Sequence, residues 1–91
     1  FKGGESMRLD DFLKTVSPTT ELELDLVTAE PEEKHVIANG VKKEVIPTLI
    51  SKDIAYLDMF DIYEVRLTYT RVGDSTNTYP IIYVLAKENF Y

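Results

Sequence analysis

The C-terminal third of the chain contains the feature that most constrains its fold. Two apolar segments, residues 63–71 and 79–87, flank a polar stretch at residues 73–78. Apolar and polar residues alternate in the first segment, which is typical of a strand with one buried face. Two such segments around a polar loop that contains glycine predict a β-hairpin. The second segment is apolar on both faces, so we expect it to be a central strand covered on both sides.

A short amphipathic helix is expected before this sheet. Its apolar positions follow the spacing i, i+3, i+4, i+7, which places them on one helix face. They are Leu9, Phe12, Leu13 and Val16. The segment Ser17-Pro18 should end the helix, because a residue that precedes proline disfavours the α conformation. The sequence therefore predicts a helix over residues 7–16.

The middle of the chain shows further strand patterns. Leucines and acidic residues alternate strictly over residues 21–26, which predicts a half-buried strand with an acidic, solvated face. The Asn39-Gly40 pair lies between residues 34–38 and 41–45 and predicts a second hairpin, since both residues tolerate positive φ.

Residues 46–62 match neither the helical nor the strand periodicity strongly. Pro47 excludes a central strand position there. We expect a short helical segment near residues 48–60, with Ser51 or Asp53 as its cap. Taken together, the patterns predict an α+β fold in which the N-terminal helix packs on a mostly antiparallel sheet of about five strands.

The length and the residue content limit the classes of protein that fit. A chain of 91 residues forms one domain. We interpret residues 1–6 as an expression-tag remnant before Met7, and residues 7–91 as a single α+β domain. The absence of cysteine excludes disulfides and thiolate zinc sites, and it favours a reducing, cytoplasmic location. No apolar run is long enough for a membrane helix.

The acidic excess is confined to one part of the chain. Residues 1–33 contain nine acidic and three basic residues, whereas residues 34–91 contain seven of each, so the whole net charge of −6 lies in the first third. Nucleic-acid phosphates and anionic membranes require basic patches, which argues against both as direct partners. The favoured partner is another protein with a basic surface.

No catalytic, cofactor-binding or metal-binding motif is evident. His35 is the single histidine, and we interpret it as a surface residue on a strand, because no nucleophile motif accompanies it. Asp53, Asp58 and Asp61 could converge on a divalent cation, but they do not match a calcium loop. Gly40 and Gly73 are interpreted as turn residues, so no phosphate-binding loop and no cofactor are predicted.

The candidate interaction residues fall into two groups. The acidic candidates are Glu21, Glu23, Asp25, Glu30, Glu32 and Glu33, and the aromatic candidates are Phe90 and Tyr91 at the C-terminus. The acidic group is either a solubility device that also protects a strand edge or a docking surface for a basic partner. Tyrosines are numerous as well, and most of them are explained by packing in a sheet.

The opening of the predicted domain carries a resemblance. Residues 7–16 read Met-Arg-Leu-Asp-Asp-Phe-Leu-Lys-Thr-Val, and a Leu-x-Leu-x-Leu strand follows at residues 22–26. This pattern resembles small uncharacterised proteins encoded by phages and prophages of Gram-positive bacteria. The resemblance spans the N-terminal part alone and implies a cytoplasmic accessory protein. It carries over no functional residue.

Three functions are consistent with these patterns. The first is a non-enzymatic protein–protein interaction module of a phage or mobile element, with an acidic inhibitor of a host nucleic-acid-binding system as one form. The second is a structural protein that self-associates, as a homodimer, through an uncovered sheet edge or through the aromatic tail. The third is a small metal-dependent enzyme that uses Asp53, Asp58 and Asp61.

Overall fold

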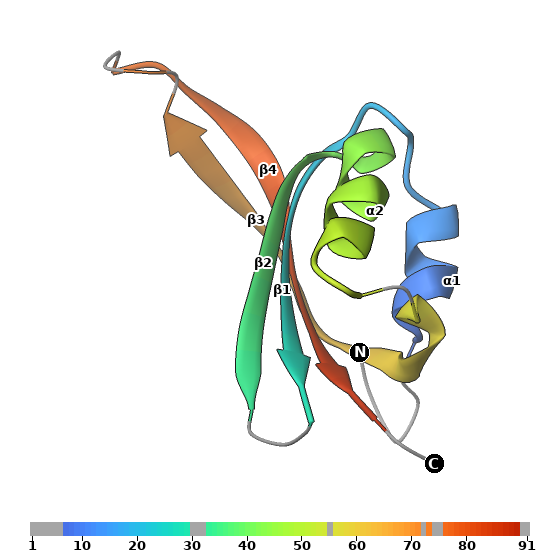
Figure 1. The fold of residues 1–91 in the computed structure, drawn as a ribbon. Helices are drawn as coiled ribbons and strands as arrows, with labels where there is room; N and C mark the ends of the chain where they lie inside the picture. The colour runs from blue at the N-terminus through green and yellow to red at the C-terminus, as the bar shows by residue number, and fades with distance from the viewer. Residues whose placement is uncertain (1–6, 30–32, 55, 72, 74–75, 90–91) are drawn as a thin grey trace.

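A computed structural model of the chain describes residues 7–29, 33–54, 56–71, 73 and 76–89. The elements follow in the order α1 (Leu9–Lys14), β1 (Glu21–Thr28), β2 (Lys34–Val41), α2 (Lys42–Ser51), the 3₁₀ turn η1 (Leu57–Met59), β3 (Phe60–Arg71) and β4 (Thr78–Glu88). Figure 1 shows the helices packed on one face of a twisted sheet. The predicted α+β class is confirmed.

The sheet has the strand order β2-β1-β4-β3. β1 pairs with β2 and β3 pairs with β4 in antiparallel fashion, whereas the central strands β1 and β4 are parallel. The described residues therefore form a mixed sheet of four strands, which corrects the prediction of about five. Two of the three pairings are antiparallel, as predicted, and the parallel β1–β4 pair is the part that was not foreseen. The segment α2–η1 carries the chain from one sheet edge to the other, so β4 returns beside β1 in the same direction. Alternation along one strand does not reveal which strand will pair with it.

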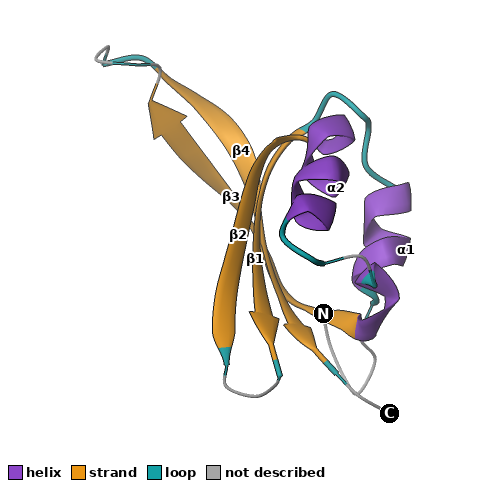
Figure 2. Cartoon of the chain, viewed as in Figure 1, coloured by secondary structure: helices purple, strands orange, loops and turns teal. Residues whose placement is uncertain are grey.

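The hydrophobic core lies between the sheet and the helices (Figure 2). Three leucines of β1 form its floor, and they are almost completely buried: Leu22, Leu24 and Leu26. Val84 and Ala86 of β4 extend this floor. Since side chains alternate along a strand, the residues of β1 and β4 between these positions face the opposite side. No described helix covers that side, and we call it the open face.

α1 confirms the predicted N-terminal helix but is shorter than expected. Leu9 and Leu13 are buried in the core, and Phe12 and Val16 pack against it. The helix ends at Lys14, where Thr15 forms the cap and its hydroxyl donates to the carbonyl of Phe12. All four residues of the predicted apolar stripe therefore contact the core, as expected.

The predicted Asn39-Gly40 hairpin is wrong. β2 runs straight through both residues, and its pairing with β1 extends from Lys34 to Val41. Gly40 has φ of +130°, a conformation that residues with a Cβ rarely adopt, and the chain enters α2 two residues later. The positive φ thus serves the passage from strand to helix. The actual β1–β2 connection falls at residues 29–33.

The helical segment predicted near residues 48–60 is confirmed only in part. η1 (Leu57–Met59) lies inside that range, but the main helix, α2, already begins at Lys42 and ends at Ser51, so Ser51 lies at its end and does not cap its start. Val45 and Leu49 anchor the helix in the core. Pro47 lies within it, where the missing N–H removes one helical hydrogen bond. Anchoring by these buried side chains offsets that loss.

The C-terminal hairpin is confirmed as β3 and β4, and β4 occupies the expected central position. The expectation that layers cover both of its faces is wrong, since α1 and α2 lie on one side only (Figure 2). A bulge interrupts the β3–β4 register between Ile62 and Glu64. Within the part of the chain that the structure describes, no helix has the length and apolar character needed to cross a bilayer.

Candidate functional site

Strand alternation places the acidic residues of β1 on the open face. Leu22, Leu24 and Leu26 face the helices, so Glu21, Glu23 and Asp25 point away from them. The register brings Glu23 beside Asn39 of β2 and Tyr83 of β4. The sequence thus predicted the correct side for all three carboxylates.

Asp25 is the best-connected residue of the open face. Its Oδ2 accepts a hydrogen bond from the hydroxyl of Tyr83 at 3.0 Å, and its Oδ1 lies 2.8 Å from Nδ1 of His35. Because an ionised carboxylate can only accept, Nδ1 of His35 carries the shared proton. Only 9% of Asp25 is exposed, so the prediction of a solvated carboxylate is corrected here. Its neighbours on β2 and β4 both cover and satisfy it.

The network continues onto β3. The guanidinium of Arg66 lies 4.6 Å from the centre of the Tyr83 ring, and its Nη1 is 3.3 Å from Glu64 Oε2. Burial is the main cause that raises the pKa of Tyr83, and the hydrogen bond with Asp25 adds to it. His35, Asp25, Tyr83 and Arg66 therefore link all four strands across the open face.

A hollow of about 270 Å³ lies beside this network. Its polar lining consists of Glu21, Glu23, Asn39, Thr70 and Tyr79, and Leu22, Gly40 and Ile81 complete it. Glu21 and Glu23 are both half-buried and are about 7 Å apart along the strand. Two carboxylates and an amide in one concave site favour a ligand that is rich in N–H donors, such as a guanidinium or ammonium group.

The other predicted interaction residues do not join this hollow. Glu33 is exposed in the β1–β2 connection, next to Lys34 at the far end of β2. Four further candidates lie outside the described residues: Glu30, Glu32, Phe90 and Tyr91. The structure therefore assembles Glu21 and Glu23 into one site and separates Glu33 from them.

Sequence reasoning missed the polar partners from β2, β3 and β4. His35 was correctly interpreted as a surface strand residue, with 62% of its side chain exposed, but its contact with Asp25 was not foreseen. Tyr83 and Asn39 were missed for the same reason. The alternation of side chains along each strand could have predicted that both residues lie on the open face. Their proximity to β1 could not be predicted in this way, because it depends on the strand order.

The aspartates considered for a metal site remain apart. Asp53 follows α2, Asp58 lies in η1 and Asp61 lies in β3, where Asn89 donates to its Oδ2 at 2.8 Å. Over the described residues, no three or more His, Asp and Glu side chains gather in a way that could hold a metal ion.

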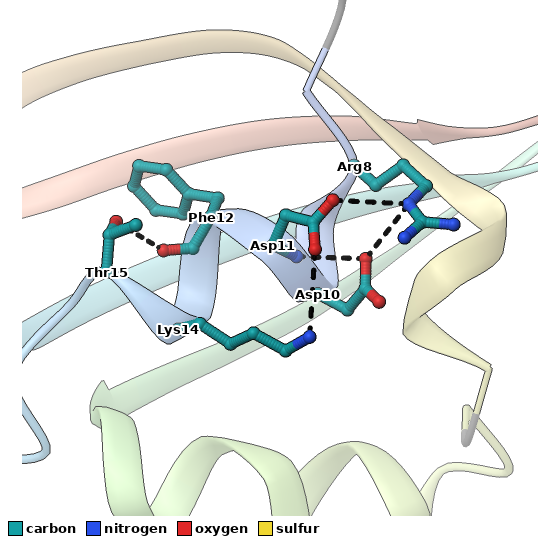
Figure 3. Close-up of polar contacts among 6 residues, drawn as sticks. All are labelled: Arg8, Asp10, Asp11, Phe12, Lys14 and Thr15. Carbon is teal, nitrogen blue, oxygen red and sulfur yellow. Dashed lines mark hydrogen bonds and ion pairs between the residues drawn. The ribbon is translucent and has the colours of Figure 1, made fainter.

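The acids of α1 belong to a separate cluster on the helical side (Figure 3). Arg8 Nε lies 3.5 Å from Asp10 Oδ1 and 3.4 Å from Asp11 Oδ2, and Lys14 lies 3.7 Å from Asp11. Asp10, and then Asp11, raise the pKa of Arg8. These carboxylates are already balanced by bases of the same helix, so the acidic hollow on the open face is the stronger candidate for binding.

Comparison of the chain with protein-family models, with curated proteins and with solved structures gave no match.

Proposed function

We propose that this chain is a non-enzymatic binding module whose open face recognises a basic surface of another protein. The observation that carries the proposal is the hollow in which Glu21 and Glu23 lie together with Asn39 and Thr70. All four belong to the paired region of the sheet, so the site needs little ordering when a partner binds. A cytoplasmic accessory role in a phage or mobile element belongs to the same proposal.

Charge supports the choice of a basic partner. The chain carries a net charge of −6, and the open face presents two half-buried carboxylates within one hollow. Partly buried charges are screened less by salt than fully exposed ones. A guanidinium that enters the hollow can donate N–H hydrogen bonds to both carboxylates, which makes arginine the favoured anchor. In one form, the partner is a nucleic-acid-binding protein whose basic site the chain occupies.

The experiment is a calorimetric titration of the full chain with an arginine-rich peptide at low salt. We expect the double variant Glu21→Lys/Glu23→Lys to weaken binding at least about tenfold, since it replaces both attractions with repulsions. The matched control, Asp53→Lys/Asp58→Lys, makes the same charge change at two exposed acids outside the hollow.

The control separates a site from a general charge effect. If the hollow is the binding site, the control binds within about threefold of the wild type, because distant charges are largely screened. Equal losses in both double variants would mean that the peptide responds to net charge alone, and the proposed site would then be abandoned.

A further inference from the structure

β3 is an edge strand that the chain protects over only part of its length. At its start, the N–H of Ile62 donates to the carbonyl of Met7 at 2.8 Å, and Arg8 forms a bridge with Asp61. The bulge next to Glu64 then ends this region. Beyond the bulge, among the described residues, no strand pairs with the outer side of Val65–Arg71.

The uncovered stretch presents an apolar stripe. Val65, Leu67 and Tyr69 pair with Val84, Ile82 and Pro80 and lie on the same side of the sheet as the core. The hairpin, however, extends beyond both helices there (Figure 1). Leu67 is 60% exposed and Tyr69 is 62% exposed, and Val65 is exposed as well. Large apolar side chains in a continuous row indicate a contact surface.

The same three residues direct their backbone groups outward. Along a strand, side-chain face and hydrogen-bonding direction alternate together. Ile62 faces the core and donates its N–H outward to Met7. Val65, Leu67 and Tyr69 face the same side, so their N–H and C=O groups also point away from β4. The edge therefore offers hydrogen bonds and apolar area at the same residues.

The usual protection of a strand edge is missing from this stretch. Edges are commonly protected by lysine, proline or an exposed charge. Val65–Arg71 contains no lysine or proline, and its central charge, Arg66, lies on the open face, over the ring of Tyr83 and 3.3 Å from Glu64, with 59% of its side chain exposed. Arg71 lies only at the end of the strand. The face of the edge that carries Val65, Leu67 and Tyr69 is thus uncharged.

We infer that a second copy of this chain pairs with it along β3, in antiparallel orientation about a two-fold axis at Leu67. In this register, Leu67 faces Leu67 of the second copy, and Val65 faces Tyr69 in both directions. All apolar side chains then meet on one side, and about six backbone hydrogen bonds can form between the edges. The match depends on the symmetric placement of the stripe around Leu67, which makes the segment complementary to itself.

The size of this contact predicts a weak dimer. The stripe and the free backbone edge offer on the order of 500 Å² per copy, so the pair buries on the order of 1,000 Å², close to the lower limit for a specific interface. Each copy also carries a net charge of −6, and the two copies repel each other at low salt. Added salt should therefore strengthen dimerisation, while it weakens binding at the acidic hollow.

The test is the molecular mass of the full chain in solution, measured by sedimentation equilibrium from micromolar to millimolar concentration. We expect the wild type to rise from 10.4 kDa towards twice that mass, and more readily at high salt. Leu67→Lys should raise the dissociation constant at least about tenfold, because it places like charges at the two-fold axis. The matched control is Ile50→Lys, at a residue of α2 that is 57% exposed and lies off this edge.

Two outcomes would overturn the inference. The first is a wild-type chain that stays monomeric over the whole range at both salt concentrations. The second is a dimer that Leu67→Lys leaves intact, or that Ile50→Lys disrupts equally. Circular dichroism of each variant establishes that the compared proteins are folded. The hollow and the edge share Thr70, but the substituted residues differ, so loss of dimerisation in Leu67→Lys leaves peptide binding at Glu21 and Glu23 as a separate result.

Discussion

Asp25 illustrates how one residue on the open face differs from its sequence pattern. Its strict alternation with leucine indicates a solvated carboxylate on the face of β1 opposite the leucines. The structure confirms that face but not the exposure to solvent. Its burial could not be foreseen, since it depends on Tyr83, which lies 58 residues away in sequence and hydrogen bonds to it at 3.0 Å. The candidate hollow was likewise predicted only in part. The sequence identifies Glu21 and Glu23 as candidates, whereas the contribution of Asn39, Thr70 and Tyr79 depends on the tertiary fold.

The first residue-scale prediction concerns the hydroxyl of Tyr83. Tyr83→Phe should lower the free energy of unfolding by about 1–2 kcal/mol, because it leaves one oxygen of a largely buried carboxylate without this donor. Urea denaturation measures the change. Tyr63→Phe serves as the control at an exposed tyrosine and should stay within about 0.5 kcal/mol of the wild type. Similar stabilities for all three proteins would contradict the importance of the Asp25–Tyr83 contact.

The second residue-scale prediction concerns alkaline pH. Burial, together with Asp25, raises the pKa of Tyr83 in the folded chain, so the native state holds this proton more tightly than the unfolded state does. The resulting stability is fully present below the ordinary tyrosine pKa of about 10 and is lost as pH rises through the higher folded value. Urea denaturation from about pH 9 to about pH 11 should show this loss.

Tyr83→Phe provides the control for the alkaline transition. The variant should lose less stability than the wild type over the same pH interval. A smaller loss should persist in it, because burial also raises the pKa of Tyr56, which lies near Glu88. A steeper alkaline loss in the variant than in the wild type would contradict the assignment to Tyr83.

At the level of elements, local patterns predicted α1 and the β3–β4 hairpin but failed at the β2–α2 junction. α1 and the hairpin are encoded by periodicity within a few residues. Asn39-Gly40 is a strong turn signal in isolation, yet the eight-residue pairing of β2 with β1 and the burial of Val45 and Leu49 in α2 favour a different structure. The parallel β1–β4 pair has no local signal, since it joins segments about 60 residues apart in sequence.

The element-scale prediction addresses this junction. Gly40→Ala should lower the free energy of unfolding by about 1–3 kcal/mol, because φ of +130° is strained for a residue with a Cβ. The space itself is adequate, as the added Cβ would lie 3.6 Å from Glu44 Oε2. Gly73→Ala, at φ of +57°, should cost only about 1 kcal/mol by comparison. Thermal or urea denaturation compares the two, and an equal or smaller loss at Gly40 would contradict the account.

At the scale of the whole molecule, the sheet separates three surfaces. One side packs against α1 and α2, the open face carries the acidic hollow, and the edge at β3 carries the apolar stripe. The two proposals predict opposite responses to salt: binding of a basic partner at the hollow should weaken as salt rises, whereas pairing of two acidic copies along the edge should strengthen. A dimer through β3 would leave the hollow of each copy accessible, so partner binding and self-association are compatible.

The most direct test of the central claim, that the open face is the binding surface, is an NMR titration of the chain with an arginine-rich peptide. We expect the largest changes in backbone amide shift at Glu21, Glu23, Asn39 and Tyr79, and we expect these changes to disappear at high salt. Changes centred on α1 or α2, with the open face unaffected, would contradict the account.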